Sequence, residues 1–219
     1  MNVWQILAKL HDRTVFPVKQ QFNRFRLNAM GIQTDIGFKA FGHHSLTVSG
    51  SGSFRIGKNV SIGREVMIRV GDNGSVEISD DVQIQDFGCI LCGGHLKIGK
   101  GSILVNGVSI YCDGNINIGE YVVTAAYTHI MDVDHQTADL TRPILLQGLT
   151  KPRPVVIGDD VWFGAKCTVA PGVTIGSHAI IGAHSFVNRD IPEYAVAVGS
   201  PARVIKFRNK TVGGDENAV

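Results

Sequence analysis

A six-residue repeat constrains the fold of this chain more than any other feature. Residues 157–187, which read IGDDVWFGAKCTVAPGVTIGSHAIIGAHSFV, carry an aliphatic or aromatic residue at every sixth position. These positions are Ile157, Phe163, Val169, Ile175, Ile181 and Val187, and Gly or Ala follows each of the first five. A period of six differs from the 3.6 of a helix and the two of a simple strand. It predicts short strands separated by tight turns, which stack as the coils of a hexapeptide β-helix.

The repeat also runs through the first half of the chain. It begins at Ile56 and restarts at Ile78, Ile98 and Ile118, each time eight to ten residues after the previous repeat position. The additional residues are turn formers, for example the Gly-Asp-Asn-Gly of residues 71–74. We therefore expect six coils, which begin at positions 56, 78, 98, 118, 157 and 175, with a seventh ahead of them. The repeat residues should point inward, so Trp162 should point outward.

The longest break in the repeat separates Ile130 from Ile157, a gap of 27 residues. A corner of the coil needs far fewer, so we expect the loop 131–156 to leave the β-helix. Loops of this length in compact domains are commonly functional. Ile144, Leu145, Leu146 and Leu149 give this loop an apolar character. We therefore expect it to pack against another surface, such as a neighbouring subunit.

Composition and charge narrow the class of protein. Glycine accounts for 26 of 219 residues, which fits many tight corners, and the net charge of +2 argues against nucleic acid as a partner. The four cysteines favour buried thiols in a reducing compartment, and no apolar run approaches a membrane span. We expect a cytoplasmic protein with a helical cap over residues 1–30, a β-helix over 31–208 and a frayed tail over 209–219. The basic residues of the cap predict contact with an anionic membrane surface.

Three stretches of the chain resemble the hexapeptide-repeat acyltransferases. The segment that begins VVIGDDVWFGAKC and ends PARVIKF is similar to their C-terminal half, closest to the maltose and galactoside O-acetyltransferases and to the capsule and lipopolysaccharide O-acetyltransferases. The segment IGEYVVTAAYTHIMDVDH resembles their pattern IGxxVxIAxxVxIxDxxH, and FNRFRLNAMGIQTDIG resembles the start of polysaccharide-modifying members. The resemblance covers about residues 22–208. It implies an all-β, left-handed parallel β-helix that works as a homotrimer.

The resemblance also implies roles for individual residues. His135, ten residues after Ala125, stands at the position of the catalytic base, and Trp162 stands at that of the acceptor-site tryptophan. Gly107 aligns with an asparagine that many sugar acetyltransferases carry, and Asn106, one residue away, is the candidate for contact with the acceptor. The positions implied for acetyl-CoA are Ala125, Ala165, Ala183, Asn188, Arg189, Arg203 and Lys206.

The chemistry implied is acyl transfer from a thioester to an alcohol. An imidazole with a pKa near 6.5 suits removal of the hydroxyl proton at neutral pH. Asp132, Asp134 and Asp139 are candidates to orient the His135 ring, and His129 is a second candidate base. We expect O-acetylation of a sugar hydroxyl of a surface polysaccharide or its lipid-linked precursor, with no bound metal.

Three other functions stay open. N-acylation of an amino sugar would need the same base. A metal-dependent hydratase of the γ-carbonic-anhydrase kind would need three converging histidines. A β-helix that binds without catalysis would need none of these groups.

Overall fold

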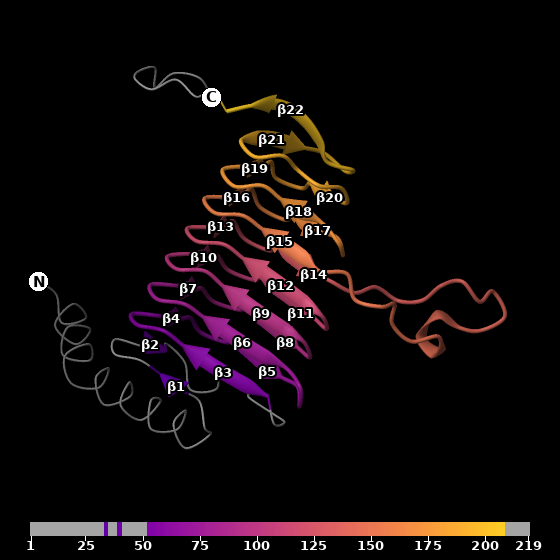
Figure 1. The fold of residues 1–219 in the computed structure, drawn as a ribbon, viewed down its shortest axis with the longest axis horizontal. Coiled ribbons are helices and arrows are strands. Elements are labelled where there is room, and N and C mark those ends of the chain that lie inside the picture. Colours follow the sequence, from indigo (N-terminus) through magenta and orange to yellow (C-terminus); the bar gives the residue numbers. More distant parts are fainter. Residues whose placement is uncertain (1–32, 35–38, 41–51, 209–219) are drawn as a thin grey trace, which may run out of the picture.

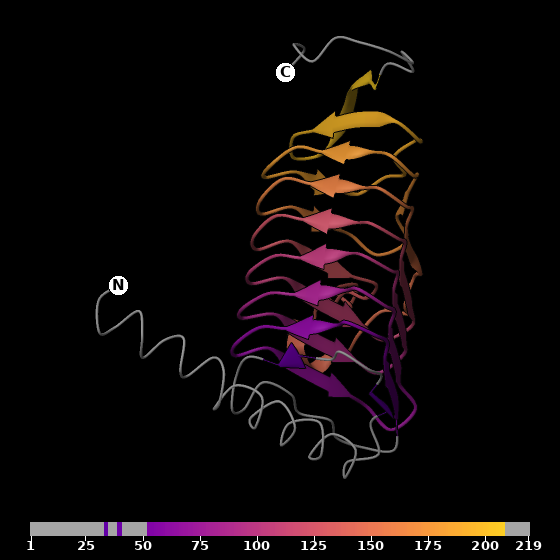
Figure 2. The ribbon, with the colours of Figure 1, turned by 90° about the vertical axis from the view of Figure 1, so that its left-hand side faces the viewer.

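The structure is a computed structural model that describes residues 33–34, 39–40 and 52–208. Three parallel β-sheets form the sides of a stack of triangular coils, and the coils follow one another in the order of the sequence (Figure 1, Figure 2). This confirms the predicted fold class, a left-handed parallel β-helix with one long extruded loop. The helical cap expected over residues 1–30 and the tail over 209–219 lie outside the described residues. Within the described residues, no helix has the length and apolar character needed to cross a membrane.

Each coil contributes one strand to each sheet in turn. Sheet A consists of β1 (Gln33–Thr34), β3 (Ser53–Ile56), β6 (Ser75–Ile78), β9 (His95–Ile98), β12 (Asn115–Ile118), β15 (Val155–Ile157) and β18 (Thr174–Ile175). Sheet B consists of β2 (Lys39–Ala40), β4 (Ser61–Ile62), β7 (Gln83–Ile84), β10 (Ile103–Leu104), β13 (Val123–Thr124), β16 (Trp162–Phe163), β19 (Ile180–Ile181), β21 (Ala195–Val198) and β22 (Arg203–Phe207). Sheet C consists of β5 (Met67–Val70), β8 (Cys89–Cys92), β11 (Ser109–Cys112), β14 (His129–Met131), β17 (Thr168–Val169) and β20 (Phe186–Val187).

The ends of the described β-helix differ from its middle. Strands β1 and β2 pair in parallel with β3 and β4, which supplies two sides of the seventh coil expected ahead of Ile56. At the other end, β22 turns back and pairs antiparallel with β21. Sheet B therefore ends in an antiparallel strand, and the parallel stack does not continue past it.

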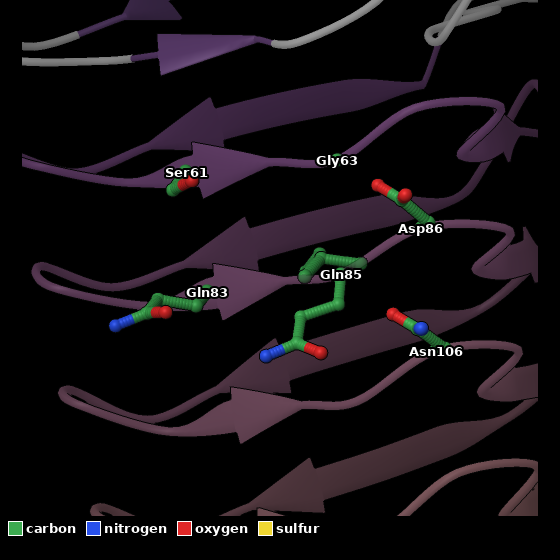
Figure 3. A pocket seen from close by; sticks show the side chains of 7 residues that line it. Ser61, Gly63, Gln83, Gln85, Asp86 and Asn106 are labelled. Atoms are coloured by element: carbon green, nitrogen blue, oxygen red, sulfur yellow. The ribbon is translucent and has the colours of Figure 1, made fainter. Parts of the chain in front are cut away.

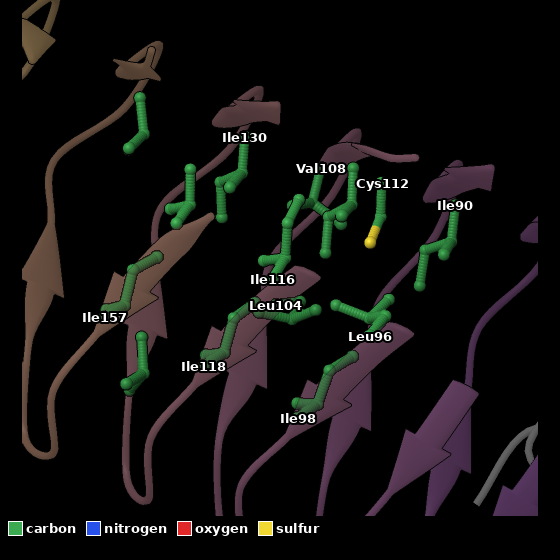
Figure 4. Close-up of a cluster of buried hydrophobic side chains, with 14 of the residues drawn as sticks. Ile90, Leu96, Ile98, Leu104, Val108, Cys112, Ile116, Ile118, Ile130 and Ile157 are labelled. Carbon is green, nitrogen blue, oxygen red and sulfur yellow. The ribbon is translucent and has the colours of Figure 1, made fainter. Parts of the chain in front are cut away.

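The repeat residues fill the interior of the coils, as the six-residue period predicts. Ile90, Leu104, Ile118 and Ile130 are each 0% exposed, and Figure 4 shows such side chains converging between the sheets. Thr124 is the one polar residue among the eighteen repeat positions, and its hydroxyl accepts a hydrogen bond from the Val105 N–H at 3.2 Å. The repeat positions thus form an apolar column whose polar exception is satisfied.

Two of the three corners place one residue per coil in the left-handed backbone region. At the corner between sheets A and B these residues include Asn59, Asp81, Tyr121, Asp160 and His178, and at the corner between sheets B and C they include Glu65, Phe87, Tyr127, Lys166 and His184. Glycine is the residue that usually adopts this conformation. In the coil of β9 and β10 glycine does so, as Gly101 and Gly107, but in the other coils the stacking imposes this conformation on larger side chains. Most of these corners therefore carry no glycine signal in the sequence.

Candidate active site

The long loop forms an ordered ribbon. Residues 132–154 leave the corner between sheets C and A, after β14, and project away from the coils (Figure 1). Its two arms run antiparallel: the Gln136 N–H donates to the Gly148 carbonyl at 3.0 Å, and the Thr150 N–H donates to the Asp134 carbonyl at 2.7 Å. His135 pairs with Leu149 in the bridge between these bonds. The backbone of His135 is therefore held in place, and its side chain is exposed.

The tip of this ribbon is folded around one amide side chain. The Gln147 side chain donates to the carbonyls of Asp139 and Arg142 at 2.8 and 2.9 Å and accepts from the Asp139 N–H at 3.0 Å. These bonds support a short 3₁₀ helix, η2 (Ile144–Leu146). Around it, apolar side chains face solvent, with Leu140 95% exposed and Leu145 80% exposed. An ordered tip with this exposed apolar surface is suited to contact with another molecule.

Asp132 anchors the ribbon to the body of the β-helix. Its carboxylate is fully buried and accepts the N–H groups of Asp113 and Gly114, each at 2.8 Å, while its carbonyl accepts the Arg153 N–H at 2.7 Å. The residue that begins the loop in one coil thus accepts hydrogen bonds from two backbone N–H groups at the corner of the preceding coil. Asp132 is a structural residue that sets where the ribbon starts.

None of the three candidate aspartates contacts the His135 ring. Asp132 binds backbone groups, Asp134 faces Arg153 with 4.0 Å between the carboxylate and the guanidinium, and Asp139 accepts from Thr141. The ring makes no hydrogen bond to any residue in the described part of the chain. Sequence reasoning therefore placed the histidine in the loop but could not identify a partner for it.

We expect replacement of Asp132 by alanine to lower the free energy of unfolding by about 3 kcal/mol, because two buried N–H groups lose a charged acceptor. Asp132→Asn, which keeps one acceptor oxygen, should cost about half as much. Urea unfolding monitored by circular dichroism measures both changes. Asp134→Ala is the matched control, since Asp134 is exposed, and should stay within about 0.5 kcal/mol of the original chain. A loss below 1 kcal/mol in Asp132→Ala would mean that the anchor is not needed.

The predicted cofactor residues gather along another edge of the molecule. Ala125, Ala165 and Ala183 lie in successive coils at the corner between sheets B and C, and Asn106 lies one coil before them. The N–H groups of Ala165 and Ala183 donate to no group in the described residues, so they are available to a ligand. We call this row the B/C edge.

The outer face of sheet B adjoins the B/C edge. Trp162 lies on β16 and is 53% exposed, as the inward position of Phe163 predicts. Arg203 and Lys206 lie on β22 at the end of the same sheet, and both are exposed. A ligand along the B/C edge would thus have an aromatic wall beside it and cations at one end.

The other edge of sheet C carries three of the predicted residues, His135, Asn188 and Arg189. The loop with His135 leaves the corner between sheets C and A, and Asn188 and Arg189 follow β20 at that same corner. Sheet C separates this corner from the B/C edge. One subunit therefore does not bring His135 together with Trp162.

His129, the second candidate base, is part of the outer face of sheet C. Its Nδ1 atom lies 3.1 Å from the Ser109 hydroxyl, and its ring packs edge-on against Tyr111 with ring centroids 5.1 Å apart. Both contacts hold His129 on sheet C, away from the exposed ribbon that carries His135.

Among the residues described, no three His, Cys, Asp or Glu side chains form a group that could hold a metal ion. The four cysteines, all within the described part, are free thiols.

The burial of His129 predicts a pH-dependent loss of stability. Burial lowers the pKa of its imidazole below the usual 6.5. As the pH falls past that value, the unfolded chain binds a proton that the folded chain still resists, so the free energy of unfolding decreases. We expect the thermal midpoint to fall between about pH 7 and pH 5 and to fall less in His129→Gln. His95→Gln is the matched control, because His95 contacts Ser75 in the same way at 2.7 Å but is exposed on sheet A.

Equal pH slopes for the original chain and His129→Gln would contradict this account. A loss of stability at lower pH has a different origin in Asp160. The hydrogen bond from His178 lowers the pKa of Asp160 below its usual 3.8. The stability that this carboxylate contributes is present above that value and is lost as the pH falls below it, outside the window of His129.

Comparisons with known proteins agree with the repeat. The family model for the bacterial transferase hexapeptide (six repeats) matches residues 154–189. The chain is 32% identical over 152 residues to the galactoside O-acetyltransferase of Escherichia coli, a match that covers 69% of this chain and 70% of that protein. It is 36% identical over 149 residues to a Mycobacterium tuberculosis protein named as a probable acetyltransferase, but this match spans 68% of the chain and only 44% of the relative.

Solved structures share the fold. The polySia-specific acetyltransferase NeuO superposes with a TM-score of 0.59 at 24% identity, over 85% of this chain and 91% of that one. The N-acyltransferase AntD from Bacillus cereus, solved with dTDP and 3-hydroxybutyryl-CoA, superposes with a TM-score of 0.53 at 22% identity, over 85% of this chain and 89% of that one. At these identities the likeness concerns the β-helix itself.

Proposed function

The chain belongs to the bacterial hexapeptide-repeat acetyltransferases, and we propose that it transfers an acetyl group from acetyl-CoA to a sugar hydroxyl. The observation that carries this proposal is the exposed His135 on an ordered ribbon at the height of the B/C edge. In the reaction, the His135 imidazole takes the proton of the hydroxyl while its oxygen attacks the thioester carbonyl. The tetrahedral adduct then collapses, the carbon–sulfur bond breaks, and the proton is returned to the CoA sulfur. The products are an acetylated sugar and free CoA.

The surface along the B/C edge supports binding of acetyl-CoA. The N–H groups of Ala165 and Ala183 are donors for the amide carbonyls of the pantetheine arm, and Ala125 keeps the edge narrow beside them. Arg203 and Lys206 are exposed cations suited to the phosphate groups. Asn188 and Arg189 reach this arm only from a neighbouring subunit, since they lie at the corner between sheets C and A.

A homotrimer would complete the site. Rotation about a threefold axis parallel to the axis of the β-helix keeps every coil at its own height. The ribbon leaves after β14, in the same coil as β13, so it would meet sheet B of the next subunit near β13 and β16. His135 of one subunit would then face Trp162 of the next. The exposed Leu140 and Leu145 of the tip would pack in the same contact.

The acceptor class follows from the family and the chemistry. The relative that matches over the larger share of its length is named for O-acetylation of a galactoside, so a hydroxyl sugar is the first choice. We propose a surface polysaccharide or its lipid-linked precursor as the acceptor, modified on the cytoplasmic side. The basic segment 1–30 would hold the enzyme at the membrane that carries this precursor.

Release of the CoA thiol tests the proposed activity. The purified protein would be incubated with acetyl-CoA and a panel of neutral sugars, each paired with its amino-sugar analogue. We expect thiol release to rise above hydrolysis with at least one hydroxyl sugar, and mass spectrometry to find an added acetyl group on oxygen. Transfer only to the amino analogues would assign N-acylation instead. Absence of both transfer and acetyl-CoA binding would overturn the proposal.

A further inference from the structure

A shallow pocket of about 240 Å³ lies on the outer face of sheet B, where β4, β7 and the residues that follow β10 meet the corner between sheets B and C. Its polar lining comes from Ser61, Gln83, Gln85, Asp86 and Asn106 (Figure 3). We call it the amide pocket. It lies in the coils before those of Ala125 and Trp162, on the side away from Arg203 and Lys206. The positions proposed for CoA therefore leave it unused.

Apart from Asp86, the polar lining is neutral and rich in groups that both donate and accept. The side chains of Gln83, Gln85 and Asn106 make no hydrogen bond to any residue that the structure describes, and Figure 3 shows them beside the same opening. Each primary amide offers two N–H donors and one carbonyl acceptor, and the Ser61 hydroxyl adds one of each kind. Such a set matches the hydroxyl groups of a sugar, which also donate and accept.

The one carboxylate of the pocket is already paired. Both the Nε and the Nη2 atoms of Arg64 donate to one oxygen of Asp86, at 2.9 and 2.6 Å, and the Arg64 N–H donates to the other at 2.8 Å. Asp86 thus offers no unpaired negative charge, and Arg64 no unpaired positive charge. An acidic sugar or a phosphate would find no free cation here, whereas a neutral sugar needs none.

The pocket is aligned with the proposed acetylation site. Gln83, Ile103, Val123 and Trp162 are directly opposed in register on neighbouring strands of sheet B. Three strand spacings separate Gln83 from Trp162, a distance of about 14 Å. This is longer than a single sugar ring. The outward side chains of Ile103 and Val123 form an apolar floor between them, suited to the C–H faces of intervening sugar rings.

We propose that the amide pocket binds a neutral sugar residue of the acceptor, at a distance from the residue that is acetylated. The acceptor is then an oligosaccharide or polysaccharide chain laid along sheet B, and a single sugar fills only part of the binding surface. This inference rests on the proposed acetyl transfer, because that reaction places the modified residue near Trp162. An extended peptide is a less suitable occupant, because it would pair with a free strand edge, and β4, β7 and β10 have parallel neighbours on both sides.

Chain-length dependence tests the inference. The probes are neutral glucose, galactose and N-acetylglucosamine oligomers of one to five residues, assayed by CoA thiol release. For the oligomer series that is accepted, we expect kcat/KM to rise about tenfold or more from the monomer to the longer chains, as a few added hydrogen bonds would give. In Gln83→Ala/Gln85→Ala this rise should disappear, while turnover of the monomer should change less than about twofold.

The matched control is Asn117→Ala, which removes an exposed amide from sheet A. It should keep the full dependence on chain length. No dependence in the original protein, or the same dependence in the double variant, would overturn the inference. So would crosslinking of a peptide, and not of a glycan, to the pocket.

A binding measurement separates this inference from the proposed reaction. Saturation-transfer NMR would record contacts of the same oligomers with the protein. If no sugar is acetylated but longer oligomers bind and Gln83→Ala/Gln85→Ala abolishes binding, the reaction is wrong and the pocket inference stands. If sugars are acetylated and neither transfer nor binding depends on chain length, the proposed reaction stands and the pocket inference is wrong. Absence of binding by every oligomer overturns the pocket inference.

Discussion

Replacement of His135 by alanine is expected to lower the rate of acetyl transfer by a factor of about 10² to 10⁴, the usual contribution of a general base. The expected loss lies in kcat, because the imidazole acts on the proton that moves in the transition state and makes no contact that binds the ground state alone. The measurement is CoA thiol release with a sugar identified by the panel described above. Acetyl-CoA affinity, measured separately by calorimetry, should be unchanged.

Stability provides the first control for this variant. His135 is exposed and its ring bonds to no described residue, so the free energy of unfolding should change by less than about 0.5 kcal/mol. His129→Gln provides the second control, and it should keep turnover within a few-fold of the original rate at neutral pH. A His135→Ala protein that retains nearly full turnover would remove this residue from the mechanism. Loss of turnover in His129→Gln alone would assign the base to sheet C.

Mixed trimers of His135→Ala and Trp162→Ala subunits are expected to recover activity that neither variant has alone. In the proposed assembly each site takes His135 from one subunit and Trp162 from the next. Random mixing in equal amounts leaves about a quarter of the sites with both original residues. Trp162→Ala alone should lose about tenfold or more in turnover, as is usual for an aromatic side chain that an interface buries, here that of the proposed trimer. The mixture should therefore exceed the mean of the two variants severalfold.

The mixing experiment needs proof that subunits exchange. The two variants would carry different affinity tags, and doubly tagged trimers would be isolated after denaturation and refolding of the mixture. Trimers of each variant combined without denaturation are the control and should show no recovery. If isolated mixed trimers stay at the mean of the two variants, the site does not combine His135 and Trp162 from different subunits.

The scaffold was predictable because its signal is local and repeated. Every repeat position from Ile56 to Val187 that the sequence marked as inward is buried, and the restarts at Ile78 and Ile98 coincide with strands of sheet A. A coil of a β-helix contacts only its neighbours, so each six-residue unit meets the same environment and shows the same pattern. The long loop was predictable for the converse reason, since 27 residues cannot fit a corner.

Other features depend on groups in different coils and left no such signal. The left-handed residues at the corners, such as Asp81 and Tyr127, are ordinary side chains held in place by stacking. The Asp132 carboxylate binds N–H groups 18 and 19 residues earlier in the chain, a contact that only the stacked fold creates. Because the sequence does not show this contact, Asp132 was a candidate partner of the His135 ring. In the structure it anchors the loop instead.

The sequence by itself determined the β-helix, its coil boundaries, the outward position of Trp162 and the site of the long loop. These follow from the spacing of apolar residues, because an inward side chain at every sixth position is a property of each short segment. The tertiary structure decided that His135 lies across sheet C from Trp162 and the B/C edge. It also decided that three amides with no hydrogen-bond partner among the described residues meet at the edge of sheet B. Such placements depend on which coil and which corner a residue occupies. That is settled only when the coils stack and side chains about 20 residues apart become neighbours.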